Sequence, residues 1–311
     1  MPSRFLLIVL LFFFACGKKG APNPPDRFAT NLDELKVTDG NHLELDFSEE
    51  IDTFVLALDN FQILDVQKET LAIFAIYPFL NNSQIVLATA LQDSVTYHLI
   101  GSVRDAAGNL GEIDEQFTGR KIRDTMPPTI VDFPTQVKVG KVFLKFSEAM
   151  DTSFLRGALI PKPPKNFLTR WDKGLRQVDF YPAADKDTLV RNTVYYLYLD
   201  RARDLAGNSI KPFRIYFTLD SLLPKWTLSG TVYLGDSLID GALIVARAGG
   251  PIVALAIAEH GKYTMVVTKD IEYTLEAFFD GYHSTGVGVV GKDSQLKLVE
   301  EKTPSYEDIF R

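Results

Sequence analysis

The chain has 311 residues, of which 46% are hydrophobic and 12% aromatic, so it can build two or three domains with cores of their own. Its formal net charge of −7 argues against nucleic acid as a partner, because phosphate backbones are bound by clustered Lys and Arg. The single cysteine has no second thiol to pair with, so each domain must be stabilised by packing alone.

The chain begins with a short apolar run that ends at this cysteine. Residues 5–15 are apolar throughout, and Cys16 follows directly. These 11 residues are too few to cross a bilayer as a helix, which takes about 20, so they are predicted to be the core of a signal peptide. The segment resembles the signal peptide of bacterial lipoproteins, which carries a small residue before the acylated cysteine. Phe13 departs from the Leu that this pattern usually has.

The lipoprotein resemblance implies a signal peptide at 1–15 and lipid attachment at Cys16. The Pro-rich residues 16–27 would then form an extended tether. No Asp follows the cysteine, which favours the outer membrane, facing the periplasm or the cell surface. The alternative is an ordinary signal peptide with an incidental cysteine.

A repeat with an offset of 99 residues organises the middle of the chain. Leu-Asp-Phe-Ser-Glu at 45–49 returns as Leu-Lys-Phe-Ser-Glu at 144–148, and Arg-Asp-Ala-Ala-Gly-Asn at 104–109 returns as Arg-Asp-Leu-Ala-Gly-Asn at 203–208. Within each copy, short alternating strands are separated by turn residues, about seven strands in ~95 residues. This pattern predicts two β-sandwich domains in tandem.

Both copies resemble the bacterial Ig-like domains of surface-layer proteins, which share the Phe-Ser-Glu strand end and the Asp-x-Ala-Gly-Asn turn. The first copy departs at Ile51, where the second has Met150. The resemblance implies Ig-like domains at 28–123 and 124–222 and says little about activity. The Pro-containing junctions before the second and third domains are predicted to be semi-rigid.

The pattern changes from Trp226 onward, where Gly-x-Val, Gly-Ala and Gly-Tyr motifs appear. This part is similar to the carboxypeptidase regulatory-like domain, which implies a transthyretin-like, seven-stranded sandwich at 223–299. His260 replaces the Asp that this family has in one hairpin. Residues 300–311 are left as a C-terminal tail. The predicted fold class is therefore all-β, with three tandem β-sandwich domains after a lipoprotein signal peptide.

Motifs for catalysis are absent from the sequence, so the chain is predicted not to be an enzyme. No Ser or Cys is gathered with His and an acid, and no metal-binding spacing or phosphate loop occurs. His98, next to Tyr97, is interpreted as an exposed strand residue. The predicted function is a structural, adhesive or binding rod of the cell envelope, with the membrane, envelope proteins or glycans as partners and no cofactor.

Calcium is the one cofactor that the sequence leaves open. Asp105 and Asp204 occupy the two repeated turns, and further acids lie at the Phe-Ser-Glu strand ends, namely Glu49, Glu50, Asp52, Glu148 and Asp151. Calcium takes six to eight oxygens, which junctions between tandem sandwiches can supply. The alternative is that each Asp accepts hydrogen bonds within its own turn.

Trp171 is the candidate for ligand binding, because it lies in a polar segment where an exposed indole could stack on a sugar. Packing over a strand edge is the alternative. The run Tyr195, Tyr196 and Tyr198 is interpreted as part core and part surface, not as one binding platform. An alternative function is therefore a carbohydrate-binding accessory lipoprotein that works with a separate enzyme. A third is a regulatory module associated with such an enzyme.

Overall fold

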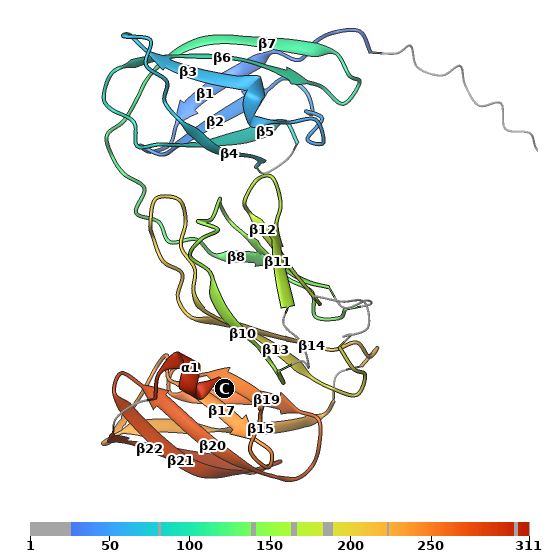
Figure 1. The fold of residues 1–311 in the computed structure, drawn as a ribbon, viewed down its shortest axis with the longest axis vertical. Coiled ribbons are helices and arrows are strands. Elements are labelled where there is room, and N and C mark those ends of the chain that lie inside the picture. The colour runs from blue at the N-terminus through green and yellow to red at the C-terminus, as the bar shows by residue number, and fades with distance from the viewer. Residues whose placement is uncertain are drawn as a thin grey trace, which may run out of the picture.

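The computed structural model describes residues 26–79, 82–137, 141–162, 167–182, 189–222, 224–301 and 304–310. In this part of the chain almost all regular structure is β, and three β-sandwiches follow one another along the sequence (Figure 1). The all-β prediction is therefore confirmed. The predicted signal peptide, Cys16 and most of the tether lie outside the described residues.

The first sandwich has seven described strands in two sheets. One sheet has the order β1-β2-β5-β4 and the other β3-β6-β7. A short 3₁₀ turn, Leu58–Asn60, precedes β3. The strands are β1 (Leu32–Val37), β2 (His42–Phe47), β3 (Phe61–Asp65), β4 (Ile73–Pro78), β5 (Gln84–Thr89), β6 (Thr96–Arg104) and β7 (Leu110–Thr118).

The second sandwich repeats this order strand for strand. Its sheets are β8-β9-β12-β11 and β10-β13-β14. In both copies the first, second, fifth and fourth strands form one sheet and the third, sixth and seventh the other, which is the strand order of the seven-stranded immunoglobulin fold. The strands are β8 (Ile130–Asp132), β9 (Val142–Phe146), β10 (Arg156–Ile160), β11 (Phe167–Trp171), β12 (Gln177–Pro182), β13 (Tyr195–Arg201) and β14 (Phe213–Phe217).

Alternation along the strands places the two cores as the sequence predicts. Leu43, Leu45 and Phe47 of β2 are buried in the first sandwich. Leu144 and Phe146 of β9 are fully buried in the second. Because successive side chains of a strand point to opposite faces, the residues between them face away from these cores.

The third sandwich has eight described strands, where the resemblance implied seven. They are β15 (Trp226–Leu234), β16 (Ser237–Leu238), β17 (Leu243–Arg247), β18 (Ile252–Ile257), β19 (Lys262–Val267), β20 (Glu272–Phe279), β21 (Tyr282–Val289) and β22 (Asp293–Glu300). β22 runs parallel to β15 along residues 293–298, and at its end it pairs with β21, so it joins the two halves of the sheet. The turn before β19 needs positive φ at both His260 (51°) and Gly261 (72°), and Asp240 caps it by accepting from the His260 N–H at 2.8 Å.

At the first joint, one end of the second sandwich contacts the face of a sheet in the first sandwich. The loops at one end of the second sandwich pack on the outer face of the β1-β2-β5-β4 sheet (Figure 1). Arg176 donates from Nη1 to the carbonyl oxygen of Pro78 at 2.7 Å, and its guanidinium lies 4.7 Å from the centre of the Tyr77 ring. The apolar residues in the contact are Ala75, Tyr77, Val86, Ala88, Ala149, Leu175 and Leu205.

The second joint, between the second and third sandwiches, buries both faces of β13. Tyr195 packs into the core of the second sandwich, whereas Tyr196 and Tyr198 belong to the same buried cluster as the core of the third. The expectation that this run is partly surface is therefore wrong, because the third sandwich covers the outer face of the strand. The described residues end in a short helix, α1 (Tyr306–Ile309), which lies at this joint (Figure 1).

Candidate functional site

The repeated Asp-x-x-Gly-Asn turns share a hydrogen bond from the Asn backbone N–H to the Asp side chain. Oδ1 of Asp105 accepts from the backbone N–H groups of Ala107 and Asn109, each at 2.9 Å. Oδ1 of Asp204 accepts from the N–H of Asn208 at 2.8 Å. Glycine follows in each turn with positive φ, 92° at Gly108 and 95° at Gly207, which explains why the motif contains this residue.

The asparagine of each turn donates a hydrogen bond to the segment that leads into the first strand of the same sandwich. Asn109 donates from Nδ2 to Oδ2 of Asp105 and to the carbonyl oxygen of Phe28, each at 2.9 Å. In the second copy, Asn208 donates to Oδ2 of Asp204 at 2.8 Å and to the backbone oxygen of Asp124 at 3.3 Å. The turn therefore positions the segment just before the first strand of each sandwich.

Three carboxylates meet at this end of each sandwich. Asp26, Glu49 and Asp105 form the group in the first copy, with their oxygens within 4.8 Å of one another. Asp124, Glu148 and Asp204 form the corresponding group in the second copy. The glutamates are the repeated residues of Phe-Ser-Glu, so the motif at the strand end and the motif at the turn come together in space.

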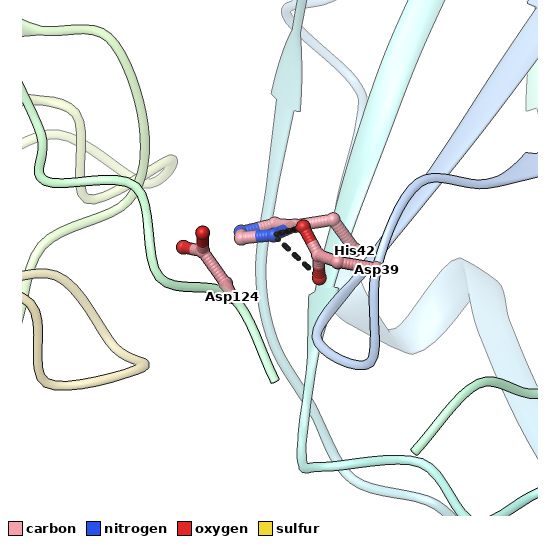
Figure 2. A group of neighbouring side chains, drawn as sticks. All are labelled: Asp39, His42 and Asp124. Atoms are coloured by element: carbon pink, nitrogen blue, oxygen red, sulfur yellow. Dashed lines mark hydrogen bonds and ion pairs between the residues drawn. The ribbon is translucent and has the colours of Figure 1, made fainter. Parts of the chain in front are cut away.

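The second of these groups lies at the first joint, where Asp39 and His42 of the first sandwich approach it. Nδ1 of His42 lies 3.2 and 3.0 Å from the two carboxylate oxygens of Asp39. Figure 2 shows Asp124 on the other side of the imidazole, reaching it from the segment that enters the second sandwich. We call Asp39, His42, Asp124, Glu148 and Asp204 the joint cluster.

Crowding of like charges changes the protonation of the joint cluster. Burial, together with the charges of Asp204 and Asp124, raises the pKa of Glu148 to about 8. Burial also disfavours the charged forms of Asp39 and His42. The contact between these two outweighs it, so the pKa of Asp39 is lowered and that of His42 is raised. At neutral pH the cluster therefore keeps a proton on Glu148 and favours the positive charge of His42.

The joint cluster has the chemistry either of a proton store or of a hard-cation site. Three carboxylates supply part of the six to eight oxygens that calcium takes. Two of those carboxylates, Asp124 and Asp204, already accept hydrogen bonds, from Met126 N–H and from Asn208. The structure thus places the calcium candidates Asp105 and Asp204 in two similar acidic groups, and calcium binding stays a prediction.

Comparison with known proteins gives no family for the chain. No family model matches it, and no curated protein does. Among solved structures, it is similar to the N-terminal part of the bacterial surface-layer protein SbsC, with 13% identity over 86% of this chain and 44% of that chain and a TM-score of 0.29. It is also similar to a structure of Escherichia coli alpha-2-macroglobulin that spans domains MG0-NIE-MG1, with 16% identity over 85% of this chain and 97% of that fragment (TM-score 0.27). A structure of titin domains A168-A170 matches with 11% identity over 89% of this chain and 100% of that one (TM-score 0.24).

The chain spans between 44% and 59% of the length of three surface-layer structures that it matches. At TM-scores of 0.29 and below these likenesses carry no weight, and the immunoglobulin-like fold is shown by the strand order of the first two sandwiches. The resemblance of the third sandwich to carboxypeptidase regulatory-like domains stays a prediction. Within the described ranges, no helix is both long and apolar enough to span a membrane.

The structure places the other predicted site residues apart from the joint cluster. Asp151 forms an ion pair with Arg203 at 2.8 Å, and Asp52 accepts from the Phe54 N–H at 3.0 Å. Trp171 is half-buried and stacks on Phe146, with 5.9 Å between ring centroids. This contact is the packing over a strand edge that was the alternative to sugar binding, and ligand binding at Trp171 stays a prediction.

Sequence reasoning missed four members of these acidic and histidine groups, Asp26, Asp39, His42 and Asp124. For the two entering-chain residues a signal exists, since Asp26 precedes Glu49 at nearly the same spacing as Asp124 precedes Glu148. Asp39 and His42 carry no such signal, because they reach the cluster only when the second sandwich packs on the first. His98 lies on the outer face of β6 beside Asp114, as expected for an exposed strand residue.

Proposed function

We propose that this chain is a lipid-anchored, non-catalytic protein of the cell envelope that acts as a stiff spacer rod. The N-terminal sequence supports the anchor, since its apolar run ends at Cys16. A cysteine acylated more than once would hold the protein firmly, because a single acyl chain binds membranes only marginally. In this proposal residues 16–27 lift the rod off the outer membrane.

The two buried joints are the observation that carries the proposal. Flexible multidomain chains leave their domains joined by linkers alone, whereas here each pair of neighbouring sandwiches shares a buried apolar contact. β13 is the clearest case, since five successive residues from Tyr195 to Leu199 are buried. A rod with fixed joints can hold its distal end at a set distance and angle from a membrane.

The surroundings of the histidines support a non-catalytic role. Within the described ranges, the histidine rings with a hydrogen bond contact carboxylates, namely Asp39, Asp114 and Glu301. A nucleophilic mechanism needs a serine or cysteine beside the imidazole, and these contacts supply none. We therefore assign chemistry to one residue only, Cys16, as the acceptor of the lipid.

Metabolic labelling with a fatty acid, followed by membrane fractionation, tests the anchor. We expect the intact chain to incorporate the label and to sediment with the outer membrane, and Cys16→Ser to lose both properties. Cys16 is the only cysteine of the sequence, so no other thiol can accept the lipid and the variant is decisive. A wild-type chain that sediments with the outer membrane without incorporating the fatty-acid label would contradict the anchor.

Protease shaving of intact cells tests which side the rod faces. Release of third-sandwich fragments, with an intracellular protein left intact, would place the rod at the cell surface and support envelope proteins or glycans as partners. Release only after the outer membrane is opened would place it in the periplasm as a scaffold. Protection in both conditions would contradict an envelope rod.

A further inference from the structure

The last described residues, 304–310, lie across the second joint. They contain α1, whose first turn is capped by Ser305, since its Oγ accepts from the Asp308 N–H at 3.2 Å. A helix of four residues has no stability of its own in water, because nucleation of a helix is unfavourable. Its order must therefore come from the surfaces that it contacts.

The second sandwich contributes an aromatic surface to this contact. The ring of Tyr198 on β13 stacks on Tyr306 at 6.5 Å and lies 5.5 Å from the ring of Phe310. The guanidinium of Arg156 on β10 lies 4.3 Å from the centre of the Tyr306 ring. Tyr198 is 4% exposed, and these rings, together with the third sandwich, cover its side chain.

The third sandwich contributes an arginine and part of its core. Arg247 on β17 donates from Nη2 to the carbonyl oxygen of Ile309 at 3.3 Å. The same guanidinium also donates from Nε to the Glu276 carboxylate at 2.8 Å and from Nη1 to the carbonyl oxygen of Gly250 at 3.0 Å. Ile309 is 7% exposed and belongs to the buried cluster shared by both sandwiches.

We propose that residues 304–310 are an intramolecular clasp that fixes the angle between the second and third sandwiches. The clasp binds one sandwich through Tyr198 and Arg156 and the other through Arg247. It lies on the side of the third sandwich that faces the second (Figure 1). The two sandwiches also touch directly, through Tyr196 and Val266 and through Arg214 and Thr264. The clasp adds the contacts of Arg156 and Arg247 to these, and each added contact restricts rocking of one sandwich on the other. This inference does not depend on where the protein is anchored.

A distance measurement across the joint tests the clasp. The full chain with Cys16→Ala would carry spin labels at Leu168→Cys on β11 and Val287→Cys on β21, whose side chains are 46% and 55% exposed. The variants are a deletion of 304–311 and Phe310→Ala. Phe54→Ala, which removes an exposed aromatic residue of the first sandwich, is the control.

We expect one narrow distance distribution for the wild type and for the Phe54→Ala control, and a broad distribution for the deletion and for Phe310→Ala. β18 lies against β10, β13 and β14 of the second sandwich, so its backbone amides report on the joint. In the two variants they should exchange with solvent roughly tenfold faster than in the wild type. This corresponds to about 1.4 kcal/mol, about the loss of one aromatic pair. Added peptide of residues 304–311 should narrow the distribution of the deletion again. A narrow distribution in Phe310→Ala, with the fold intact by circular dichroism, would overturn the clasp, and this variant decides if the deletion unfolds.

Discussion

The hydroxyl of Tyr196 on β13 donates a 2.6 Å hydrogen bond to the carbonyl oxygen of Val266 on β19, and this bond joins the second sandwich to the third. Tyr196 is fully buried. We expect Tyr196→Phe to lower the free energy of unfolding by about 1 kcal/mol, because the part-buried carbonyl of Val266 loses its partner across the joint. Urea unfolding of the full chain measures this difference.

Tyr195→Phe is the matched control for the second joint. The Tyr195 hydroxyl accepts from the Val190 N–H at 2.8 Å inside the second sandwich, so its loss should leave the joint closed. Limited proteolysis between the sandwiches should therefore speed up in Tyr196→Phe and not in Tyr195→Phe. Equal cleavage rates in the two variants would show that the hydroxyl of Tyr196 contributes nothing to the joint.

Loss of the proton on Glu148 should make the first joint less stable as the pH rises. Its pKa is about 8 in the folded chain and about 4.3 in an unfolded one. The folded state therefore binds this proton more tightly between these values. The resulting stability is complete below about pH 4 and is lost as the pH rises through 8. Glu148→Gln carries no titrating group at this position, so its stability should fall less than that of the wild type in this window; His42, whose pKa is also raised, still titrates in both chains.

At pH 8.5 we expect Glu148→Gln to exceed the wild type by about 1–3 kcal/mol in the free energy of unfolding, a range that allows for partial exposure of the carboxyl. Thermal unfolding from pH 5 to 9 gives the comparison. Glu50→Gln, an exposed glutamate of the first sandwich outside the joint cluster, should follow the wild-type curve. Parallel curves for all three chains would rule out Glu148 as the group responsible.

Asp204→Ala should destabilise the second sandwich whether or not calcium is present. The substitution removes the acceptor of two hydrogen bonds from Asn208, so we expect a loss of about 1–3 kcal/mol. Thermal melting with calcium and with a chelator checks this, and Asp204→Asn keeps one acceptor oxygen as a control. A wild-type melting temperature that rises with calcium and an Asp204→Ala variant that does not respond would instead identify a cation site.

Trp171→Ala should affect stability and not sugar binding. The indole stacks on Phe146, which is fully buried, so we expect a loss of about 2–3 kcal/mol for a half-buried aromatic residue. Trp171→Phe should restore most of this stability by keeping the stacked ring. A glycan array shows whether the wild type binds a sugar. Binding that is lost in a folded Trp171→Ala chain would support the carbohydrate-binding alternative.

The sequence predicts the two immunoglobulin-like sandwiches well because their signals are local. Alternation along β2 and β9 and the repeated turns act within one sandwich, and both copies carry them. The same reasoning places Asp105 and Asp204 in equivalent turns, which the hydrogen bonds of Asn109 and Asn208 confirm. Each of these features is decided by residues close together in the chain or in one sheet.

Contacts between sandwiches are what the sequence does not reveal. His42 is polar and lies on the outer face of β2, so its pattern indicates a solvent-exposed residue, yet it lies between Asp39 and Asp124. Tyr196 and Tyr198 likewise look like a surface until the third sandwich covers them. Docking of one folded unit on another gives no periodic pattern, and so Asp39 and His42 could not be assigned to the joint cluster from spacing.

The first joint has a consequence for how such a chain can grow by duplication. The surface of the first sandwich that contacts the second includes Val86 and Ala88 of β5, which pair with Glu44 and His42 of β2. By the pairing register of β12 with β9, the residue of the second sandwich that corresponds to Val86 is Asp179, which is buried and forms an ion pair with Lys141 at 2.6 Å. A further copy docked in the same way would have to displace that pair, so the second sandwich does not repeat the apolar surface that the first presents at this position.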